Sequence, residues 1–261
     1  MNITLPHLPE RPSQPRKDGL TMVMDKGLSL HQAEDLISSA APFTDLVKLG
    51  FGTAVFCSAL KEKVSLYKSA GLKPYFGGTL FEAFIIRGMF DEYRSMLDEY
   101  GLETAEVSDG TMQMNHNDKM EYIHTLSRQV TVLSEVGSKV SGVELPDSEW
   151  VQQMHTELSA GAWKVIAEAR ESGTSGIYNS DSSANNELIS LIIDRIGSDK
   201  VLWEAPHKSQ QVFFIKLLGA NVNLGNISPF EVTALEALRL GLRGDTLFDF
   251  LPDMYKHLKR Q

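Results

Sequence analysis

Six short apolar runs of this sequence carry an ionisable residue at their last or next-to-last position, and these residues are the first candidates for chemistry. They are Asp25, Lys48, Glu106, Glu135, Glu168 and Glu204. A charged side chain is costly to bury unless it meets a partner or a ligand. Carboxylate oxygens suit a hard cation such as Mg²⁺, and a lysine suits an anion. The set therefore indicates a site for a charged small molecule, although rings of paired lysine and glutamate also occur as polar core layers in barrels.

The last quarter of the chain shows this pattern most densely. The run 201–204 is followed by Ala-Pro-His-Lys-Ser, and the run 221–224 is followed by Gly225-Asn226-Ile227. The stretch Ser228-Pro229-Phe230-Glu231 has the form of a capping box with proline at the first helical position. We expect a helix to begin there.

Short strand-like runs alternate with helical patterns along most of the chain, and these elements must position the charged residues. We expect strands over 20–25, 44–49, 73–76, 104–107, 131–136, 163–168, 201–204 and 221–224. Eight such units in about 250 residues are typical of a single (β/α)8 TIM barrel, whose functional groups lie at the carboxyl ends of the strands. A doubly wound sheet is the competing fold, but Asp25-Lys-Gly-Leu-Ser29 lacks the glycine-rich phosphate turn expected after its first strand.

Composition limits the class of protein. The 261 residues are 42% hydrophobic, enough for one large α/β domain. The net charge of -9 and the pI near 5.3 argue against nucleic acid or an anionic membrane as the main partner. The single cysteine excludes an internal disulfide and fits a reducing cytoplasm. Residues 1–18 form a proline-rich lead without the features of a signal peptide, and no apolar run approaches a membrane span. We expect a cytoplasmic homo-oligomer with its barrel domain over 19–261.

Nine blocks of sequence, in order, resemble the phosphosulfolactate synthase family from Gly19 onward. The blocks are Gly19-Leu-Thr-Met-Val-Met-Asp-Lys-Gly27, Val47-Lys-Leu-Gly-Phe-Gly-Thr53, Gly77-Gly-Thr-Leu-Phe-Glu82, Glu106-Val-Ser-Asp-Gly110, Ser134-Glu-Val-Gly-Ser-Lys139, Arg170-Glu-Ser-Gly173, Glu204-Ala-Pro-His-Lys-Ser-Gln-Gln211, Asn223-Leu-Gly-Asn-Ile227 and Gly241-Leu-Arg-Gly-Asp-Thr246. The resemblance implies a Mg²⁺-dependent barrel lyase that adds sulfite to C3 of phosphoenolpyruvate, giving (2R)-2-O-phospho-3-sulfolactate.

The implied reaction suggests roles for particular residues. Glu135, Glu168 and Glu204 end three consecutive strands, so their side chains could converge on Mg²⁺, with Asp25 and Glu106 in reserve. Lys139 matches the family position proposed as the acid that protonates C2. Lys139, Lys48 and Arg170 are the predicted catalytic residues.

The two substrate anions need cations and backbone N–H groups. Phosphate is expected at the loops after strands seven and eight, near Gly225 and Asn226. Lys208, Arg170 or Arg243 would supply charge there, and Lys26 would assist Lys48 with sulfite.

Two alternatives remain open from the sequence. The first is another phosphoenolpyruvate or aldolase-type barrel enzyme, in which Lys48 or Lys164 would form a Schiff base. The second is a non-catalytic, stress-associated barrel protein with an inherited pocket, because the family includes a plant heat-stress-associated relative.

Overall fold

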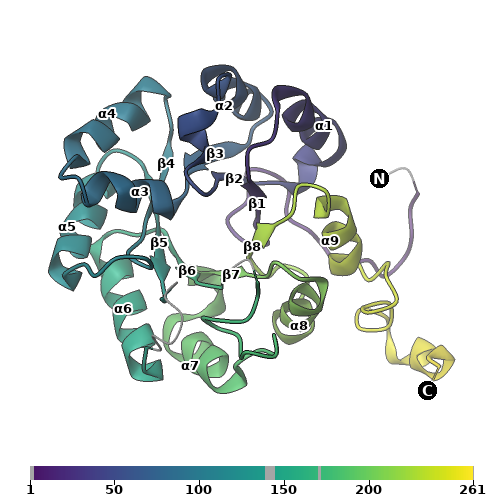
Figure 1. Cartoon of the computed structure of the whole chain (residues 1–261). Coiled ribbons are helices and arrows are strands. Elements are labelled where there is room, and N and C mark those ends of the chain that lie inside the picture. Colours follow the sequence, from purple (N-terminus) through teal and green to yellow (C-terminus); the bar gives the residue numbers. More distant parts are fainter. Residues whose placement is uncertain (1–2, 139–144, 170–171, 261) are drawn as a thin grey trace.

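A computed structural model describes residues 3–138, 145–169 and 172–260 of the chain. Eight parallel strands alternate with helices around a central axis (Figure 1). The hydrogen-bonded strand order is β3-β2-β1-β8-β7-β6-β5-β4, and β3 and β4 at its two ends lie in contact. The predicted (β/α)8 barrel is confirmed.

The strands are short and each is followed by at least one helix. The strands are β1 (Thr21–Asp25), β2 (Leu46–Leu49), β3 (Lys73–Phe76), β4 (Thr104–Val107), β5 (Thr131–Val136), β6 (Lys164–Ala167), β7 (Val201–Glu204) and β8 (Leu224–Ile227). The α-helices are α1 (Leu30–Ala40), α2 (Leu60–Ser69), α3 (Gly78–Ile85), α4 (Phe90–Glu99), α5 (His116–Ser127), α6 (Asp147–Ala160), α7 (Asn186–Ile196), α8 (Lys208–Leu218) and α9 (Val232–Arg239). In the described part of the chain, the 3₁₀ turns η1 (Ala41–Phe43), η2 (Thr53–Phe56) and η3 (Ser198–Lys200) lie between these elements, and η4 (Asp253–Leu258) follows α9.

The strand side chains divide into two apolar cores because neighbouring residues of a strand point to opposite faces. The larger core lies between the strands and the outer helices, and Val23, Val47 and Val165 belong to it. The smaller core fills the inside of the barrel. It consists of Leu20, Met22, Leu46, Tyr75, Leu133, Ile166 and Leu202, with Trp163 packed against it. The barrel interior is therefore closed by side chains below its carboxyl-terminal mouth.

Two elements differ most from the sequence prediction. The eighth strand begins at Leu224 rather than at Asn221, whose side chain binds Arg11 and Glu10 instead. The last α-helix begins at Val232, and Ser228 does not cap it. Ser228 forms a turn before the helix, in which its backbone oxygen accepts from Glu231 N at 2.9 Å. The capping-box motif was misleading because the same residues also suit such a turn.

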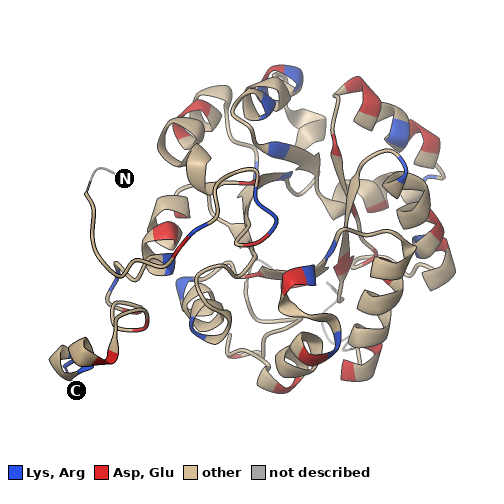
Figure 2. Cartoon of the chain, turned by 180° about the vertical axis from the view of Figure 1, so that it is seen from behind, with Lys and Arg blue, Asp and Glu red and all other residues tan. Residues whose placement is uncertain are grey.

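The amino-terminal lead crosses the end of the barrel opposite the mouth (Figure 2). Arg16 donates to Asp45 at 2.8 Å and to the Pro42 carbonyl oxygen at 2.7 Å, both of which precede β2. Arg11 reaches Glu236 of α9 at 2.9 Å. The lead therefore joins the first and last parts of the barrel. Within the described ranges, none of the helices combines the length and apolar character needed to span a bilayer.

Candidate active site

Strand periodicity places charged side chains directly above the inner core. Lys48, Glu135, Glu168 and Glu204 each follow an inward-facing apolar residue by two positions, after Leu46, Leu133, Ile166 and Leu202 respectively. Residues two apart on a strand share a face, so these side chains form a polar layer at the mouth. Glu106 of β4 joins them through its contact with Lys48. All five side chains are buried.

Lys48 lies at the centre of this layer. Its Nζ atom is 2.9 Å from Glu106 Oε1, 3.2 Å from Glu135 Oε2 and 3.5 Å from Glu204 Oε1. Burial alone would lower the pKa of Lys48, but the three carboxylates together hold that pKa well above its ordinary value. Lys48 is therefore a permanent cation in a layer that contains four carboxyl groups.

Glu135, Glu168 and Glu204 converge at the mouth. Each can offer one carboxylate oxygen such that the three atoms lie within 4.8 Å of one another. Glu204 is held from two sides, because its Oε2 accepts from Ala169 N at 2.9 Å and its backbone oxygen accepts from the Tyr178 hydroxyl at 2.7 Å. Burial, and after it the charges of Glu135 and Glu106, raise the pKa of Glu204 to about 7 although Lys48 and the Ala169 N–H oppose the shift.

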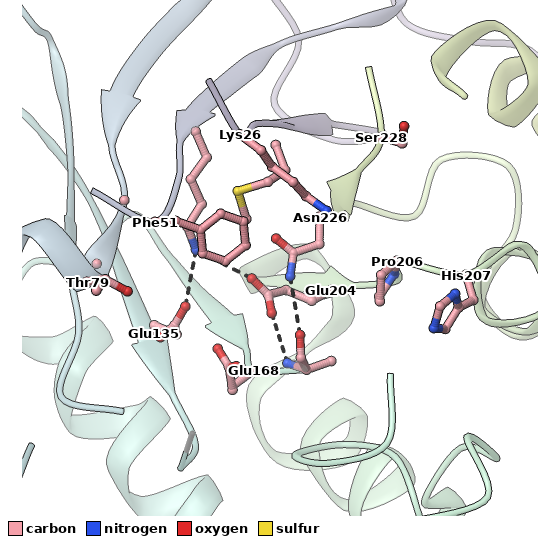
Figure 3. A pocket seen from close by; sticks show the side chains of 15 residues that line it. Lys26, Phe51, Thr79, Glu135, Glu168, Glu204, Pro206, His207, Asn226 and Ser228 are labelled. Carbon is pink, nitrogen blue, oxygen red and sulfur yellow. Dashed lines mark hydrogen bonds and ion pairs between the residues drawn. The ribbon is translucent and has the colours of Figure 1, made fainter. Parts of the chain in front are cut away.

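A cavity of about 330 Å³ opens above the carboxylates (Figure 3). Lys26 and Phe51 lie at its rim, with Lys26 Nζ 5.8 Å from the centre of the Phe51 ring. Its lining consists of Met24, Lys26, Lys48, Phe51, Gly77, Gly78, Thr79, Glu135, Glu168, Ala169, Glu204, Pro206, His207, Asn226 and Ser228. The volume suits a small organic anion together with a second small ion.

The β3–α3 turn approaches the carboxylates so closely that it requires glycine. Gly78 N donates to Glu106 Oε1 at 2.6 Å. A Cβ atom at Gly78 would lie 2.4 Å from the Ser108 Cβ and 2.6 Å from Glu106 Oε1. The first turn of α3 therefore fixes the orientation of Glu106 through its backbone.

The donor set fits a hard divalent cation. The three converging groups offer only oxygen, which is the ligand type that Mg²⁺ prefers. Among the described contacts, the single ammonium of Lys48 faces three buried carboxyl groups. In addition, Asn226 Oδ1 is buried at this cavity and accepts no hydrogen bond from the described part of the chain. A cation would satisfy both the charge and the oxygen atoms.

The other predicted site residues are distributed unevenly. Lys26 and Asn226 line the cavity, whereas Gly225 lies within β8, where an added Cβ would meet Met22 and Leu202 inside the barrel. Lys208 binds Asp245 at 3.0 Å and lies outside the lining. Arg243 is half-buried in the segment after α9 and is also outside the lining. Lys139 and Arg170 lie outside the described residues.

Asp25 points away from the mouth. Its Oδ1 accepts from Gly27 N at 2.8 Å and Leu28 N at 2.7 Å, and its Oδ2 lies 2.9 Å from Lys63 Nζ of α2. Asp25 follows the inward-facing Met24 by one residue, so its side chain belongs to the outer layer. It shapes the β1–α1 loop, which carries Lys26.

Neither lysine considered for a Schiff base suits that chemistry. Lys48 is held as an ammonium by its carboxylates, so it lacks the neutral amine that attacks a carbonyl. Lys164 begins β6 at the opposite end of the barrel, where it binds the Asp199 carbonyl oxygen and lies 3.6 Å from Asp18. The aldolase-type alternative therefore has no support among the described lysines considered for it.

Sequence reasoning missed a supporting layer of polar residues. Ser108 Oγ contacts Glu82 Oε1 at 2.6 Å and Glu135 Oε1 at 2.8 Å. Behind them, Lys119 of α5 contacts Asp109 Oδ1 and the Glu135 carbonyl oxygen, each at 2.7 Å. The helix periodicity of the sequence could have identified two of these residues. Lys119 and Glu82 occupy positions on helix faces that are otherwise apolar and buried.

Comparison with known proteins identifies a matching family. Residues 9–245 match the model of the family described as (2R)-phospho-3-sulfolactate synthase (ComA). The chain is 42% identical over 245 residues to the phosphosulfolactate synthase of Methanothermobacter thermautotrophicus, covering 92% of this chain and 95% of that protein. It is 40% identical over 244 residues to the phosphosulfolactate synthase of Bacillus subtilis, covering 92% and 97% respectively.

A solved structure supports the architecture alone. The 3-hexulose-6-phosphate synthase of Salmonella typhimurium superposes with a TM-score of 0.51 at 14% identity. The match covers 89% of this chain and all of that chain. At this identity the likeness concerns only the barrel fold.

Proposed function

The chain belongs to the phosphosulfolactate synthase family, and from that premise we propose that it is a Mg²⁺-dependent lyase that adds sulfite to C3 of phosphoenolpyruvate. The product is (2R)-2-O-phospho-3-sulfolactate. The observation that carries the proposal is the convergence of Glu135, Glu168 and Glu204 at the mouth of a barrel whose sequence matches this family over most of its length. Family membership also supports an enzyme over a non-catalytic scaffold.

The proposed reaction forms a C3–S bond and a C2–H bond, breaks the C2–C3 π bond and expels no group. The sulfur lone pair of sulfite attacks C3, and the C2–C3 π electrons move to C2 and into the adjacent carboxylate. A proton then reaches C2, and the phosphate ester stays intact. The site must therefore bring two anions together and stabilise the charge that develops beside the substrate carboxylate.

The residues of the cavity divide this work. Lys48 supplies a fixed positive charge at the floor, because its carboxylate neighbours keep it protonated. Lys26 at the rim attracts anions, and the Thr79 and Ser228 hydroxyls in the lining offer hydrogen bonds to substrate oxygens. The Phe51 ring covers part of the rim and reduces the access of water. The phosphate end would lie toward the rim and the reacting carbons toward the floor.

Glu135, Glu168 and Glu204 are the residues that would hold Mg²⁺. When bound, the ion supplies a Lewis acid next to the substrate carboxylate. Protonation of C2 is assigned to Lys139 on the resemblance alone, four residues after Glu135. Arg170 is retained on the same ground as a further cation for the substrate.

One assay tests the proposal. The purified protein is incubated with phosphoenolpyruvate and sulfite, with Mg²⁺ or with excess chelator, and the phosphate esters are followed by ³¹P NMR and mass spectrometry. We expect a phosphosulfolactate only with both substrates and the metal. Omission of sulfite, and a heat-inactivated sample, serve as controls. Absence of product under all conditions, or equal turnover in chelator, would overturn the reaction or its metal dependence respectively.

A further inference from the structure

An irregularity in β8 places Asn226 at the cavity. One residue of β1, Met22, faces two residues of β8, Gly225 and Asn226, because Thr21 is opposite Leu224 and Val23 is opposite Ile227. The extra residue makes a bulge, and Asn226 adopts a left-handed φ of 57°. Bulges redirect side chains, and asparagine tolerates this conformation better than most residues. The Asn226 side chain consequently lines the mouth instead of following the strand alternation (Figure 3).

The orientation of the Asn226 amide is fixed by chemistry. Its Nδ2 donates to the Ala169 carbonyl oxygen at 3.2 Å, and a carbonyl oxygen can only accept. The Oδ1 atom is therefore the one left at the cavity, where it is buried without a hydrogen-bond donor among the described residues. A buried acceptor without a partner costs roughly 1–3 kcal/mol. Such an atom calls for a ligand that donates or carries positive charge.

The same Ala169 peptide joins Asn226 to the carboxylate cluster. Ala169 N donates to Glu204 Oε2 at 2.9 Å while its carbonyl oxygen accepts from Asn226. The backbone of one residue thus orients a carboxylate and an amide toward the same cavity. Phosphate and sulfite oxygens are acceptors like the Asn226 oxygen, so they would form no hydrogen bond with it. A cation is the partner that suits both groups.

We propose that Asn226 Oδ1 is a neutral oxygen donor to the divalent cation held by Glu135, Glu168 and Glu204. This inference rests on the cation of the proposed function and adds to its site a residue first expected at the phosphate. An amide contributes a ligand atom without adding a further negative charge to the buried carboxyl groups. The cation thus gains a further ligand atom, and the site repels the two anionic substrates no more strongly than before.

Cation binding to the substrate-free protein tests the inference without measuring activity. Mn²⁺ binding is followed by electron paramagnetic resonance and Mg²⁺ binding by calorimetry for wild type, Asn226→Gly and Asn226→Asp. Glycine accepts the left-handed backbone and removes the amide, so we expect about 10–100-fold weaker binding. The Asn226→Asp substitution keeps a side-chain oxygen and should retain the affinity, so it controls for loss of the side chain. Ser182→Gly, at another left-handed residue (φ 66°) outside the cavity lining, controls for the backbone effect of glycine.

The outcomes distinguish a failure of the inference from a failure of the proposed function. If wild type binds neither ion, the cation of the proposed function fails and the inference fails with it. If wild type binds and Asn226→Gly binds equally well, only the role of Asn226 is overturned. Equal weakening by the Gly and Asp substitutions would also overturn it, because that result assigns the effect to the lost contact with Ala169. Circular dichroism of each variant establishes that the barrel is folded.

Discussion

Among the residues of the mouth, Glu204 is the one whose ionised form most clearly destabilises the folded protein. Its pKa of about 7 in the folded protein exceeds the ordinary carboxyl value of 4.5. The folded state therefore favours the protonated form, and stability is lost as pH rises from about 4.5 through about 7. A glutamine at this position avoids that loss and can still accept from Ala169 N.

We expect Glu204→Gln to raise the Tm of the metal-free protein relative to wild type at pH 8 and to change it little at pH 5. Added Mg²⁺ should stabilise wild type at pH 8 more than the variant, because the neutral amide is a weaker ligand than a carboxylate. Differential scanning calorimetry in chelator and in Mg²⁺ measures both effects. The exposed Glu121→Gln is the control. A wild type that remains more stable than Glu204→Gln at pH 8 in chelator contradicts the assigned pKa shift.

Lys139 is the residue whose role depends most on the family. If it protonates C2, Lys139→Ala should lower kcat by about 10²–10⁴-fold and change KM far less. Lys139→Arg should not restore the rate, because a guanidinium does not release its proton at accessible pH. Steady-state kinetics with phosphoenolpyruvate and sulfite measure both variants. A fully active Lys139→Ala removes the residue from the mechanism.

The residues of the polar layer could be predicted from the sequence, but the direction of each side chain could not. Six charged strand ends were recognisable, and five of them meet at the mouth. Asp25 differs because it is one residue after Met24 rather than two, a parity that can be counted along the amino-acid sequence itself. The hydrogen bond from Asn226 to Ala169 could not be predicted by such counting, because a bulge in β8 shifts the alternation of side chains at Asn226.

At the scale of elements, helix α3 positions the site through the close approach of its first turn. Gly78→Ala introduces a methyl group where Ser108 and Glu106 leave no space. We expect α3 to shift, the Gly78 N to Glu106 bond to lengthen, and kcat/KM to fall at least about tenfold, since small displacements of positioning groups are costly. Gly244→Ala, at a glycine with open space around it, is the matched control. Equal activity of Gly78→Ala and wild type would show that the turn has room.

Helix α5 anchors β5 through Lys119. This buried ammonium binds Asp109, the Glu135 carbonyl oxygen and Glu157. Lys119→Met leaves Glu157 buried without its cation, and we expect a loss of about 3–5 kcal/mol in the free energy of unfolding. The double variant with Glu157→Met should recover part of it. Urea denaturation measures the series, with exposed Lys61→Met as control. A loss below about 1 kcal/mol for Lys119→Met contradicts the anchoring role.

Element prediction succeeded where local pattern and tertiary packing agree. The strand at 73–76 and the strand at 104–107 were predicted with the observed bounds. The eighth strand was misplaced because Asn221-Val-Asn-Leu reads locally as a strand. Its asparagines instead bind backbone groups of distant segments and the Arg11 side chain, which no local pattern contains.

At the scale of the whole molecule, the lead acts as a strap between chain ends. Arg11 donates to both Glu236 carboxylate oxygens and to the Gly19 carbonyl oxygen. We expect Arg11→Ala to lower the free energy of unfolding by about 1.5–3 kcal/mol, the range for hydrogen bonds to a charged group. Arg94→Ala, at an exposed pair on α4, should stay within about 0.5 kcal/mol of wild type. Equal effects of the two substitutions in urea denaturation would refute the strap.

The order of hydrogen-bonded strands also determines when the chain can finish folding during its synthesis. Strands β1 to β3 form one run of neighbours and β4 to β8 another, and the two runs meet through pairing of β1 with β8. The first strand to leave the ribosome therefore cannot complete its pairing until the last strand has been synthesised. Arg239 of α9 must follow as well, because it binds the Leu20 carbonyl oxygen. Until then the nascent chain carries an open edge on β1, the kind of surface that chaperones cover and that aggregation exploits.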